Sequence, residues 1–255
     1  MTARSLRRRL ALIAAAAASF AALVSAPRAW EAFLGALYPD APRLLYERTG
    51  LATLTAQHVA LVATASVLVV LAGVPLGLWV TRPSGRDFKR VVEAAVDLGQ
   101  TFPPVAVLVL AVPALDAFGF LPTVTALFVY GLFPVVSNTI AGIESVPGDT
   151  VDAARGIGMG PWQVLARVEL PLAVRVILAG VRTSTIVAVG TATLGATVGA
   201  GGLGVPIIAG LVQRNLAYIT EGALAAALLA LLIDAALETV EDALALRSGT
   251  EAGGA

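Results

Sequence analysis

The sequence predicts an all-α integral membrane protein, and its composition is the first reason. Of the 255 residues, 58% are hydrophobic and only 13% are charged, and the mean hydropathy is +0.86. Soluble domains carry about 25% charged residues, so about half of the charge that a water-exposed surface needs is missing. We therefore expect a chain this apolar to keep most of its surface in lipid.

Six apolar segments are the second reason. A hydrocarbon layer about 30 Å thick is crossed by about 20 apolar residues in a helix, and six stretches of the chain meet that requirement. We expect transmembrane helices at residues 10–26, 58–81, 92–115, 122–143, 172–198 and 219–240. The fourth and fifth segments are joined by a long loop, residues 144–171.

The basic residues predict the orientation. Lys and Arg collect in cytoplasmic loops, and most of them lie on one side of the predicted topology. On that side are Arg4, Arg7, Arg8, Arg9, Arg82, Arg86, Lys89, Arg90, Arg155, Arg167, Arg175 and Arg247. The other side has Arg28, Arg43 and Arg48, offset by Glu31, Asp40 and Glu47, and the isolated Arg214. We therefore expect the long loop and both termini to be cytoplasmic, in a multi-pass inner-membrane protein.

The first segment has two interpretations. An arginine-rich start, an apolar run and Val24-Ser25-Ala26 also describe a secretory signal peptide. Pro27 would follow the scissile bond, which disfavours cleavage, so we expect a retained helix. The chain then divides into an N-terminal helix with an external loop (1–50), a transmembrane domain (51–245) and a short cytoplasmic tail (246–255).

Metal and dinucleotide sites are not predicted. The chain has no cysteine and a single histidine, His58, which disfavours zinc and haem centres. Residues 199–204 read G-A-G-G-L-G, but the G-x-G-x-x-G pattern binds a dinucleotide only between a strand and a helix. Here it follows a membrane helix, and we interpret it as a glycine-rich helix exit. We expect no cofactor, no nucleic-acid partner and no catalytic residue.

Two sets of acids lie in the apolar segments, where ionisable residues are functional candidates. Glu93 and Asp97 lie near the cytoplasmic start of the third segment, and Asp234, Glu238 and Glu241 share a face near the cytoplasmic end of the last. We interpret both sets as hydrated helix ends. This interpretation weakens the alternative of a secondary transporter, which needs acids near the midplane.

A stripe of small residues predicts close helix packing. Ala188, Ala192, Ala196 and Ala200 recur at every fourth position, which gives a smooth helix face for packing in lipid. The partner is either another helix of this chain or a second copy, and we favour packing within the chain.

The long loop parses into two short helices separated by glycines. Asp149 or Thr150 can cap the first helix, and Asp152 is expected in its first turn, where negative charge favours the helix dipole. Gly156 and Gly158 end this helix. At Gly158 the turn is expected to need a positive φ, which glycine adopts without strain.

The second helix of the loop is bounded by prolines. Pro161 suits its first turn, and Pro171 marks where it stops or kinks before the fifth segment. Ile157, Met159 and Trp162 are expected at the tip of the hairpin. An apolar tip fits the groove of a partner protein, and the alternative is a hairpin that lies flat on the bilayer surface.

The loop resembles a motif of the permeases of binding-protein-dependent (type I) ABC importers. The motif reads E-A-A, three residues, G, nine residues, I, one residue and L-P. Asp152-Ala153-Ala154, Gly158, Val168 and Leu170-Pro171 have the same spacing, with Asp for Glu and Val for Ile. In that family the loop is the coupling helix that docks on an ATPase subunit. The resemblance implies a coupling loop that comprises Asp152, Ala153, Ala154, Arg155, Gly156, Gly158, Met159, Trp162, Val168, Leu170 and Pro171.

Further stretches resemble the osmoprotectant branch of the family, which imports glycine betaine, choline or carnitine. These stretches include Q-T-F-P at 100–103, L-F-P-V-V at 132–136, V-E-L-P at 168–171, L-A-G-V-R-T at 178–183 and the glycines of 199–204. The resemblance implies an osmoprotectant importer permease, although Ser137 stands where the branch is expected to have a basic residue. Methionine importers share much of the pattern, so a methionine or other small-solute permease is the alternative.

ATP-driven work by this chain needs a separate subunit. A P-loop has the form G-x-x-x-x-G-K-[ST], but the only lysine, Lys89, is followed by Arg90. We therefore expect the chain not to be an enzyme itself. The resemblance implies three partners in the bilayer and beside it: an ABC ATPase, an extracytoplasmic substrate-binding protein, and a second permease copy or a paralogue.

Polar residues at mid-membrane depth are the candidates for a translocation path. They are Gln100, Thr101, Asn138, Thr139, Ser184, Thr191 and Thr193. Ser and Thr commonly satisfy the backbone of a membrane helix instead, and the sequence leaves this alternative open.

Overall fold

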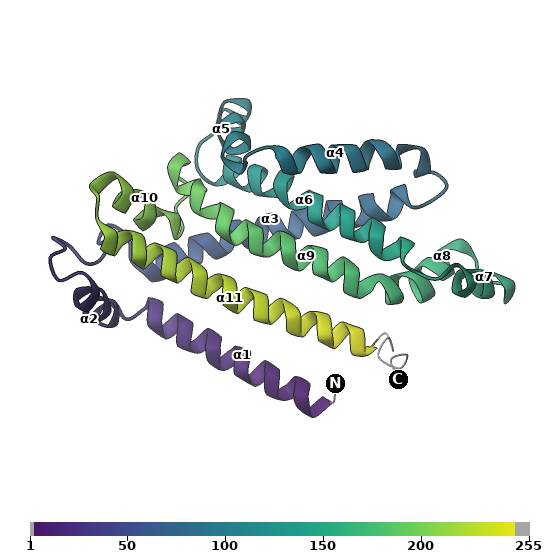
Figure 1. Cartoon of the computed structure of the whole chain (residues 1–255), viewed down its shortest axis with the longest axis horizontal. Helices are drawn as coiled ribbons and strands as arrows, with labels where there is room; N and C mark the ends of the chain where they lie inside the picture. The colour runs from purple at the N-terminus through teal and green to yellow at the C-terminus, as the bar shows by residue number, and fades with distance from the viewer. Residues whose placement is uncertain (1–2, 248–255) are drawn as a thin grey trace.

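All of the described secondary structure is helical, as the sequence predicts. The computed structural model describes residues 3–247, whose long helices run side by side in an elongated bundle (Figure 1). The long helices are α1 (Ala3–Val24), α3 (Leu51–Val80), α6 (Phe120–Glu144), α9 (Leu170–Ala192) and α11 (Leu216–Arg247). The shorter ones are α2 (Pro27–Leu37), α4 (Lys89–Thr101), α5 (Pro104–Leu115), α7 (Gly148–Gly156), α8 (Pro161–Val164) and α10 (Gly204–Gln213). Two 3₁₀ turns, η1 (Arg86–Phe88) and η3 (Thr193–Val198), and a π turn, η2 (Leu165–Glu169), complete the order.

Glycines of α3 let this helix approach α6 closely. Gly73 lies against Val135, and Gly77 lies against Thr139, where an added methyl group would be 2.6 Å from the Thr139 Cβ. Lipid tails are as apolar as leucine side chains, so membrane helices associate through van der Waals packing and interhelical hydrogen bonds. Small residues one turn apart therefore hold α3 on α6.

The contact between α6 and α9 is equally close. A methyl group on Gly180 would lie 2.5 Å from the Asn138 Cβ and 2.8 Å from the Pro134 carbonyl oxygen. One turn further along, the Ser184 hydroxyl donates a hydrogen bond to the Gly131 carbonyl at 2.9 Å. Together with α3, these two helices form the centre of the bundle.

The stripe of alanines on α9 faces this centre. Ala188 and Ala192 are buried in an apolar cluster with Leu61 and Val62 of α3 and Leu127 of α6. The prediction that the stripe packs within the chain is confirmed for these two alanines.

The number of membrane spans stays a prediction. Among the described residues, α3, α6 and α11 are each long and apolar enough to cross a membrane, and α1 with α2 would add a fourth span despite a bend of 76° between them. Helix α9 has 23 residues, but it carries Arg175 and Arg182. The structure thus supports a multi-pass protein and leaves the count of six open.

The single helix expected at 92–115 is wrong, because the chain breaks between α4 and α5. Phe102 and Pro103 are extended, with ψ angles of 135° and 133°. A proline has no N–H to donate and disfavours the helical conformation in the residue before it. The consecutive Pro103 and Pro104 therefore end one helix and begin the next.

Two short helices occupy places where the sequence predicted loops. In the expected external loop 27–50, Pro27 begins α2, which buries Trp30 and Leu34. The glycine-rich segment 199–203 leads from η3 into α10, and no strand precedes it. Three of its glycines, Gly199, Gly201 and Gly202, have φ between 79° and 84°, as a helix exit built from glycines requires.

Residues 38–50 are anchored on the first two turns of α11. Buried polar groups in such a position are normally hydrogen-bonded, and three side chains of α11 or its N-cap serve this stretch. The contacts are Tyr38 Oη to Thr220 Oγ1 (2.8 Å), Asn215 Nδ2 to the Arg43 carbonyl (2.9 Å) and Tyr46 N–H to Glu221 Oε2 (2.9 Å).

The two ends of the bundle differ in their content (Figure 1). One end carries α7 and α8 together with the Ala3 end of α1 and the Arg247 end of α11, and we call it the hairpin end. The opposite end carries α2, α10 and the stretch 38–50. The arginines that the sequence predicts to be cytoplasmic belong to elements at the hairpin end.

The close crossing of α6 and α9 gives a matched pair of substitutions on one helix. We expect Gly180→Ala to lower the free energy of unfolding by about 1–3 kcal/mol, the usual cost of overpacking, because the Pro134 carbonyl is backbone and cannot turn away. Gly190→Ala is the control, since an added methyl there meets nothing within 4 Å. The measurement is unfolding in detergent. Equal stability of both variants would contradict the packing described here.

Candidate functional site

Helix α7 begins at Gly148, before both of the expected caps. Its N-cap is Pro147, whose carbonyl accepts hydrogen bonds from the Thr150 and Val151 amides at 3.1 and 3.3 Å. The prediction that Asp149 or Thr150 caps the helix is therefore wrong. Asp149, and not Asp152, is the acid of the first turn. The early start follows from the proline, which fixes φ and favours the entry to a helix.

The turn after α7 is a Schellman motif centred on Gly158. The Met159 amide donates to the Ala154 carbonyl at 3.1 Å, and the Gly158 amide donates to the Arg155 carbonyl at 2.9 Å. These two bonds satisfy carbonyls that the helix end leaves free. Gly158 has φ +90°, so the expected positive φ is confirmed. Pro161 then occupies the first turn of α8, also as expected.

The α7–α8 hairpin (residues 148–164) presents apolar side chains outward. Ile157 is 77% exposed and Trp162 is 80% exposed, whereas Met159 is half-buried. The other expected coupling-loop residues differ in exposure. Ala154 is buried, the half-buried ones are Val168, Leu170 and Pro171, and the exposed ones are Asp152, Ala153, Arg155, Gly156 and Gly158. The motif residues thus form the helix and the turn of the hairpin. Ile157 and Trp162, which are not fixed positions of the motif, form its apolar tip.

Pro171 does not stop the helical path of the chain. The π turn η2 leads straight from α8 into α9, and Pro171 lies in the first turn of α9. A proline ring clashes with the carbonyl four residues earlier, which is that of Arg167, and a wider π turn relieves the clash. The hairpin is therefore continuous with a long helix of the bundle centre.

Sequence reasoning missed an ion pair beside this π turn. Arg82 Nη1 donates to Glu169 Oε2 at 2.7 Å, and the two residues are 87 positions apart. Glu169 follows Val168 in the motif but is not one of its fixed positions. The position of Glu169 between Val168 and Leu170 was the available signal in the sequence. Spacing along the chain did not identify Arg82 as its partner.

The expected path residues divide into two groups. Ser184 and Thr191 line a cavity of about 180 Å³ between α6 and α9, together with Tyr130. The other described side chains of this set each donate a hydrogen bond to a backbone carbonyl three or four residues earlier, at 2.7–2.9 Å. The pairs are Thr101 to Leu98, Asn138 to Pro134, Thr139 to Val135, and Thr193 to Gly190. The side chain of Gln100 lies outside the described part of the structure.

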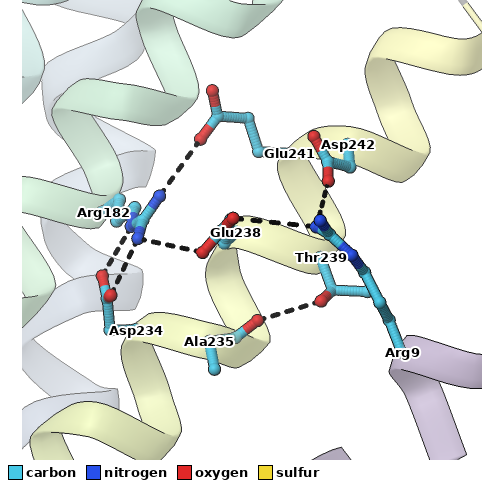
Figure 2. A network of polar contacts seen from close by, with 8 residues as sticks. All are labelled: Arg9, Arg182, Asp234, Ala235, Glu238, Thr239, Glu241 and Asp242. Atoms are coloured by element: carbon cyan, nitrogen blue, oxygen red, sulfur yellow. Dashed lines mark hydrogen bonds and ion pairs between the residues drawn. The ribbon is translucent and has the colours of Figure 1, made fainter. Parts of the chain in front are cut away.

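The acids near the hairpin end form an ionic network that joins three helices (Figure 2). Arg182 of α9 binds Asp234 through Nε at 2.5 Å and through Nη2 at 2.8 Å. The network also contains Arg182–Glu238 (3.4 Å), Arg182–Glu241 (3.9 Å), Arg9–Glu238 (3.7 Å) and Arg9–Asp242 (2.6 Å). The interpretation of these acids as hydrated helix ends is incomplete, because they are partly exposed and also paired.

The acids of α4 have a different setting. Glu93 lies 3.4 Å from Lys89 Nζ, which also donates to Glu144 at 2.5 Å. The hydrogen bond that Lys89 donates to Glu144 raises the pKa of Lys89 above its ordinary value. The side chain of Asp97 lies outside the described part of the structure.

A helical bundle with an apolar-tipped hairpin at one end is consistent with a membrane transport protein, and comparisons with known proteins identify the family. The chain belongs to the family described as the inner membrane component of binding-protein-dependent transport systems, whose model matches residues 73–248. The hairpin, α6 and α9 lie within that range, and α3 enters it from Gly73 on, so the family match covers the part that carries the candidate site.

Relatives with assigned names cover most of the chain. The osmoprotectant import permease protein OsmY of Salmonella typhimurium is 41% identical over 181 residues, 71% of this chain and 76% of its own length. The choline transport system permease protein OpuBB of Bacillus subtilis is 40% identical over 187 residues, 73% of this chain and 85% of its own. Among solved structures, an inward-facing form of the MetNI methionine ABC transporter has the same fold, with a TM-score of 0.67 at 24% identity over 74% of this chain and 93% of that one.

Proposed function

We propose that this chain is the permease subunit of an ATP-driven importer of osmoprotectants, such as glycine betaine, choline or related quaternary amines. The observation that carries the proposal is the 36–41% identity, over about two thirds or more of the chain, to permeases whose names specify osmoprotectants, choline or carnitine. The likeness to the methionine transporter, at 24% identity, supports the fold alone. A methionine or other small-solute permease is therefore the second candidate, and a secondary transporter ranks below it.

The ATPase partner would dock on the α7–α8 hairpin. Two large apolar side chains, Ile157 and Trp162, are about four-fifths exposed there, and exposed apolar patches mark interaction sites. A helix pair that presents such side chains fits the groove of another protein. The coupling loop would thus comprise the motif residues from Asp152 to Pro171, with the contact centred on the hairpin tip.

Energy for transport would enter through this contact. The only lysine, Lys89, is not part of a P-loop, so hydrolysis belongs to the partner. Reversing a two-state equilibrium from 1:99 to 99:1 takes about 5.5 kcal/mol of differential binding. Docking on an ATPase dimer that closes on ATP supplies a bias of this kind and would alternate the access of the path between the two faces of the membrane.

Two further partners complete the proposed importer. A quaternary ammonium is best recognised by an aromatic cage, but only 6% of this chain is aromatic, so selection would occur on an extracytoplasmic binding protein. A second permease copy or a paralogue would close the path against this one. Ser184 and Thr191 share a cavity, and Thr191 is the stronger path candidate, because the Ser184 hydroxyl already donates to the Gly131 carbonyl. Asn138, Thr139 and Thr193 likewise donate to backbone carbonyls.

The chain would have three parts in this arrangement. Residues 1–50 form a retained N-terminal helix with an external segment, residues 51–245 form the transporting domain, and residues 246–255 form a tail that lies almost entirely outside the described residues. Contacts of α1 with α11, which include the hydrogen bond from Arg9 Nη1 to Asp242 Oδ2 at 2.6 Å, support a retained first helix.

The hairpin end is proposed to be cytoplasmic, which topology reporters test. Because basic residues stay inside, reporters fused after Pro83, Pro147 and Arg247 should behave as cytoplasmic. Reporters fused after Asp40 and Arg214, at the opposite end, should behave as external. The readout is a pair of enzymes that are active on opposite sides of the membrane. An external signal at Pro147 would rule out docking of the hairpin on an ATPase.

The substrate assignment is tested by uptake. A strain without its own osmoprotectant uptake that carries the whole system should grow at high salt when choline or glycine betaine is added. Radiolabelled uptake in the same strain should be displaced by unlabelled betaine or choline and not by methionine. Methionine uptake without a betaine response would move the chain to the second candidate function.

The hairpin turn offers a sharp test of coupling. Gly158→Asp forces a side chain into a positive-φ position, a strain of about 1–2 kcal/mol, and space around the site is open, so the bundle should still assemble. We expect normal membrane levels with a loss of about tenfold in ATPase co-purification, the factor that corresponds to about 1.4 kcal/mol. Substrate-stimulated hydrolysis should fall with it.

Two controls isolate the turn. Gly156→Ala changes the other loop glycine, which has no positive φ and open space around it. Asp152→Glu restores the residue that the motif usually has. Both should bind the ATPase like the parent. A Gly158→Asp protein that transports like the parent would instead favour a hairpin lying on the bilayer.

A further inference from the structure

One ion pair joins the hairpin region to a helix far away in the sequence. Arg82 Nη1 donates to Glu169 Oε2 at 2.7 Å. Glu169 is the last residue of the π turn η2, which follows α8 directly, and Arg82 lies two residues beyond the end of α3. The pair therefore connects the base of the α7–α8 hairpin to α3, a helix that is not its neighbour in the chain.

This pair is more enclosed than the comparable pair between Lys89 and Glu144. The side chains of Glu169 and Arg82 are 9% and 25% exposed, against 49% and 24% for Glu144 and Lys89. The Nε atom of Arg82 is buried and has no partner in the described part of the chain. Salt screens an enclosed pair less than a surface pair, and removal of one partner leaves an uncompensated buried charge.

The backbone of Arg82 is hydrogen-bonded on both sides at the end of α3. Its amide donates to the Trp79 carbonyl at 3.0 Å, and its own carbonyl accepts from the Gly85 and Arg86 amides at 3.0 and 2.9 Å. A Cβ at Gly85 would collide with the Trp79 carbonyl, so the turn is folded tightly onto the helix. The backbone of Arg82 is therefore fixed at the end of α3, while its guanidinium is bonded to Glu169.

A cleft separates the two elements that the ion pair connects. It has a volume of about 490 Å³, with Leu78 and Trp79 of α3 on one side and Trp162 and Leu165 on the other. Arg82 also lines this cleft. Val74 and Leu78 of α3 also pack against the apolar cluster that contains Leu165, so the ion pair is the polar part of the contact between these two elements.

We propose that Arg82 and Glu169 form a positioning pair that transmits the movement of the hairpin to α3. The proposal rests on the proposed function, in which the hairpin docks on an ATPase. Without the pair, the base of the hairpin is attached to the bundle through its covalent neighbours, α6 and α9, and through the apolar cluster of Leu165. With it, a displacement of the hairpin also pulls α3, and all three helices of the bundle centre move together.

Hydrogen exchange tests the mechanical link independently of any substrate. In the purified permease, Glu169→Gln and Arg82→Gln should each speed amide exchange of residues 148–164 by at least about fivefold, as expected for a segment that opens locally more often. Arg82→Lys, which keeps the charge, should stay near the parent. Arg86→Gln, an exposed arginine of the same turn, is the matched control and should also exchange like the parent.

Transport efficiency tests the consequence in the complete importer. In proteoliposomes that contain the ATPase and the binding protein, Glu169→Gln and Arg82→Gln should lower the substrate transported per ATP hydrolysed by at least about fivefold, because each leaves an uncompensated charge. The double variant should be no worse than either single one, since contacting partners are non-additive. ATPase co-purification should remain within about twofold of the parent, because the hairpin tip is intact.

Two results would overturn the proposal. One is hairpin exchange that does not respond to either neutral substitution. The other is a loss of transport in strict proportion to ATPase binding, with transport per ATP unchanged, because that would make the pair purely structural. If the parent importer moves no osmoprotectant, the proposed substrate fails, and the exchange measurement still decides whether the pair links the hairpin to α3.

Discussion

Close backbone contact between α3, α6 and α9 is the constraint on which the remaining structure depends. Gly73 and Gly77 bring α3 onto α6, and Gly131 and Gly180 bring α6 onto α9. In lipid there is no water to drive such contacts, so shape complementarity and interhelical hydrogen bonds must do so. Other elements are placed on these helices: α4 and α5 pack on α6, α11 packs on α9, and α7 and α8 connect α6 to α9 at the hairpin end.

The parts of the fold that depend on local chemistry could be predicted from the sequence. The positive φ at Gly158 and the start of α8 at Pro161 follow from turn and capping preferences, and both are observed. The sequence misplaced features where two local rules compete. At Pro103 a long apolar run favoured one helix, but the proline backbone overrode hydropathy. At Pro147 the proline, and not the acid after it, fixed the helix start.

Long-range polar pairing could not be predicted. Arg82 and Glu169 are 87 residues apart, and Arg182 and Asp234 are 52 apart. Residue spacing within a helix indicates which side chains share a face, but not which face meets another helix. The path candidates show the same limit. Thr139 is a polar residue at the depth expected of a path, but its hydroxyl donates to the Val135 carbonyl of its own helix. Three-dimensional packing decides between these roles.

The contact between α1 and α11 has a consequence for synthesis. Arg9 and Asp242 are separated by 233 residues, and they join the first helix of the chain to the last. Domains fold from the N-terminus as they are made, yet contacts of such sequence separation must wait for the distant partner. The face of α1 that packs on α11 therefore stays uncovered by protein until the last helix is made. The final helix completes the bundle, and an interrupted translation product would keep the contacts of α1 with α2 and α3 but lack those with α11.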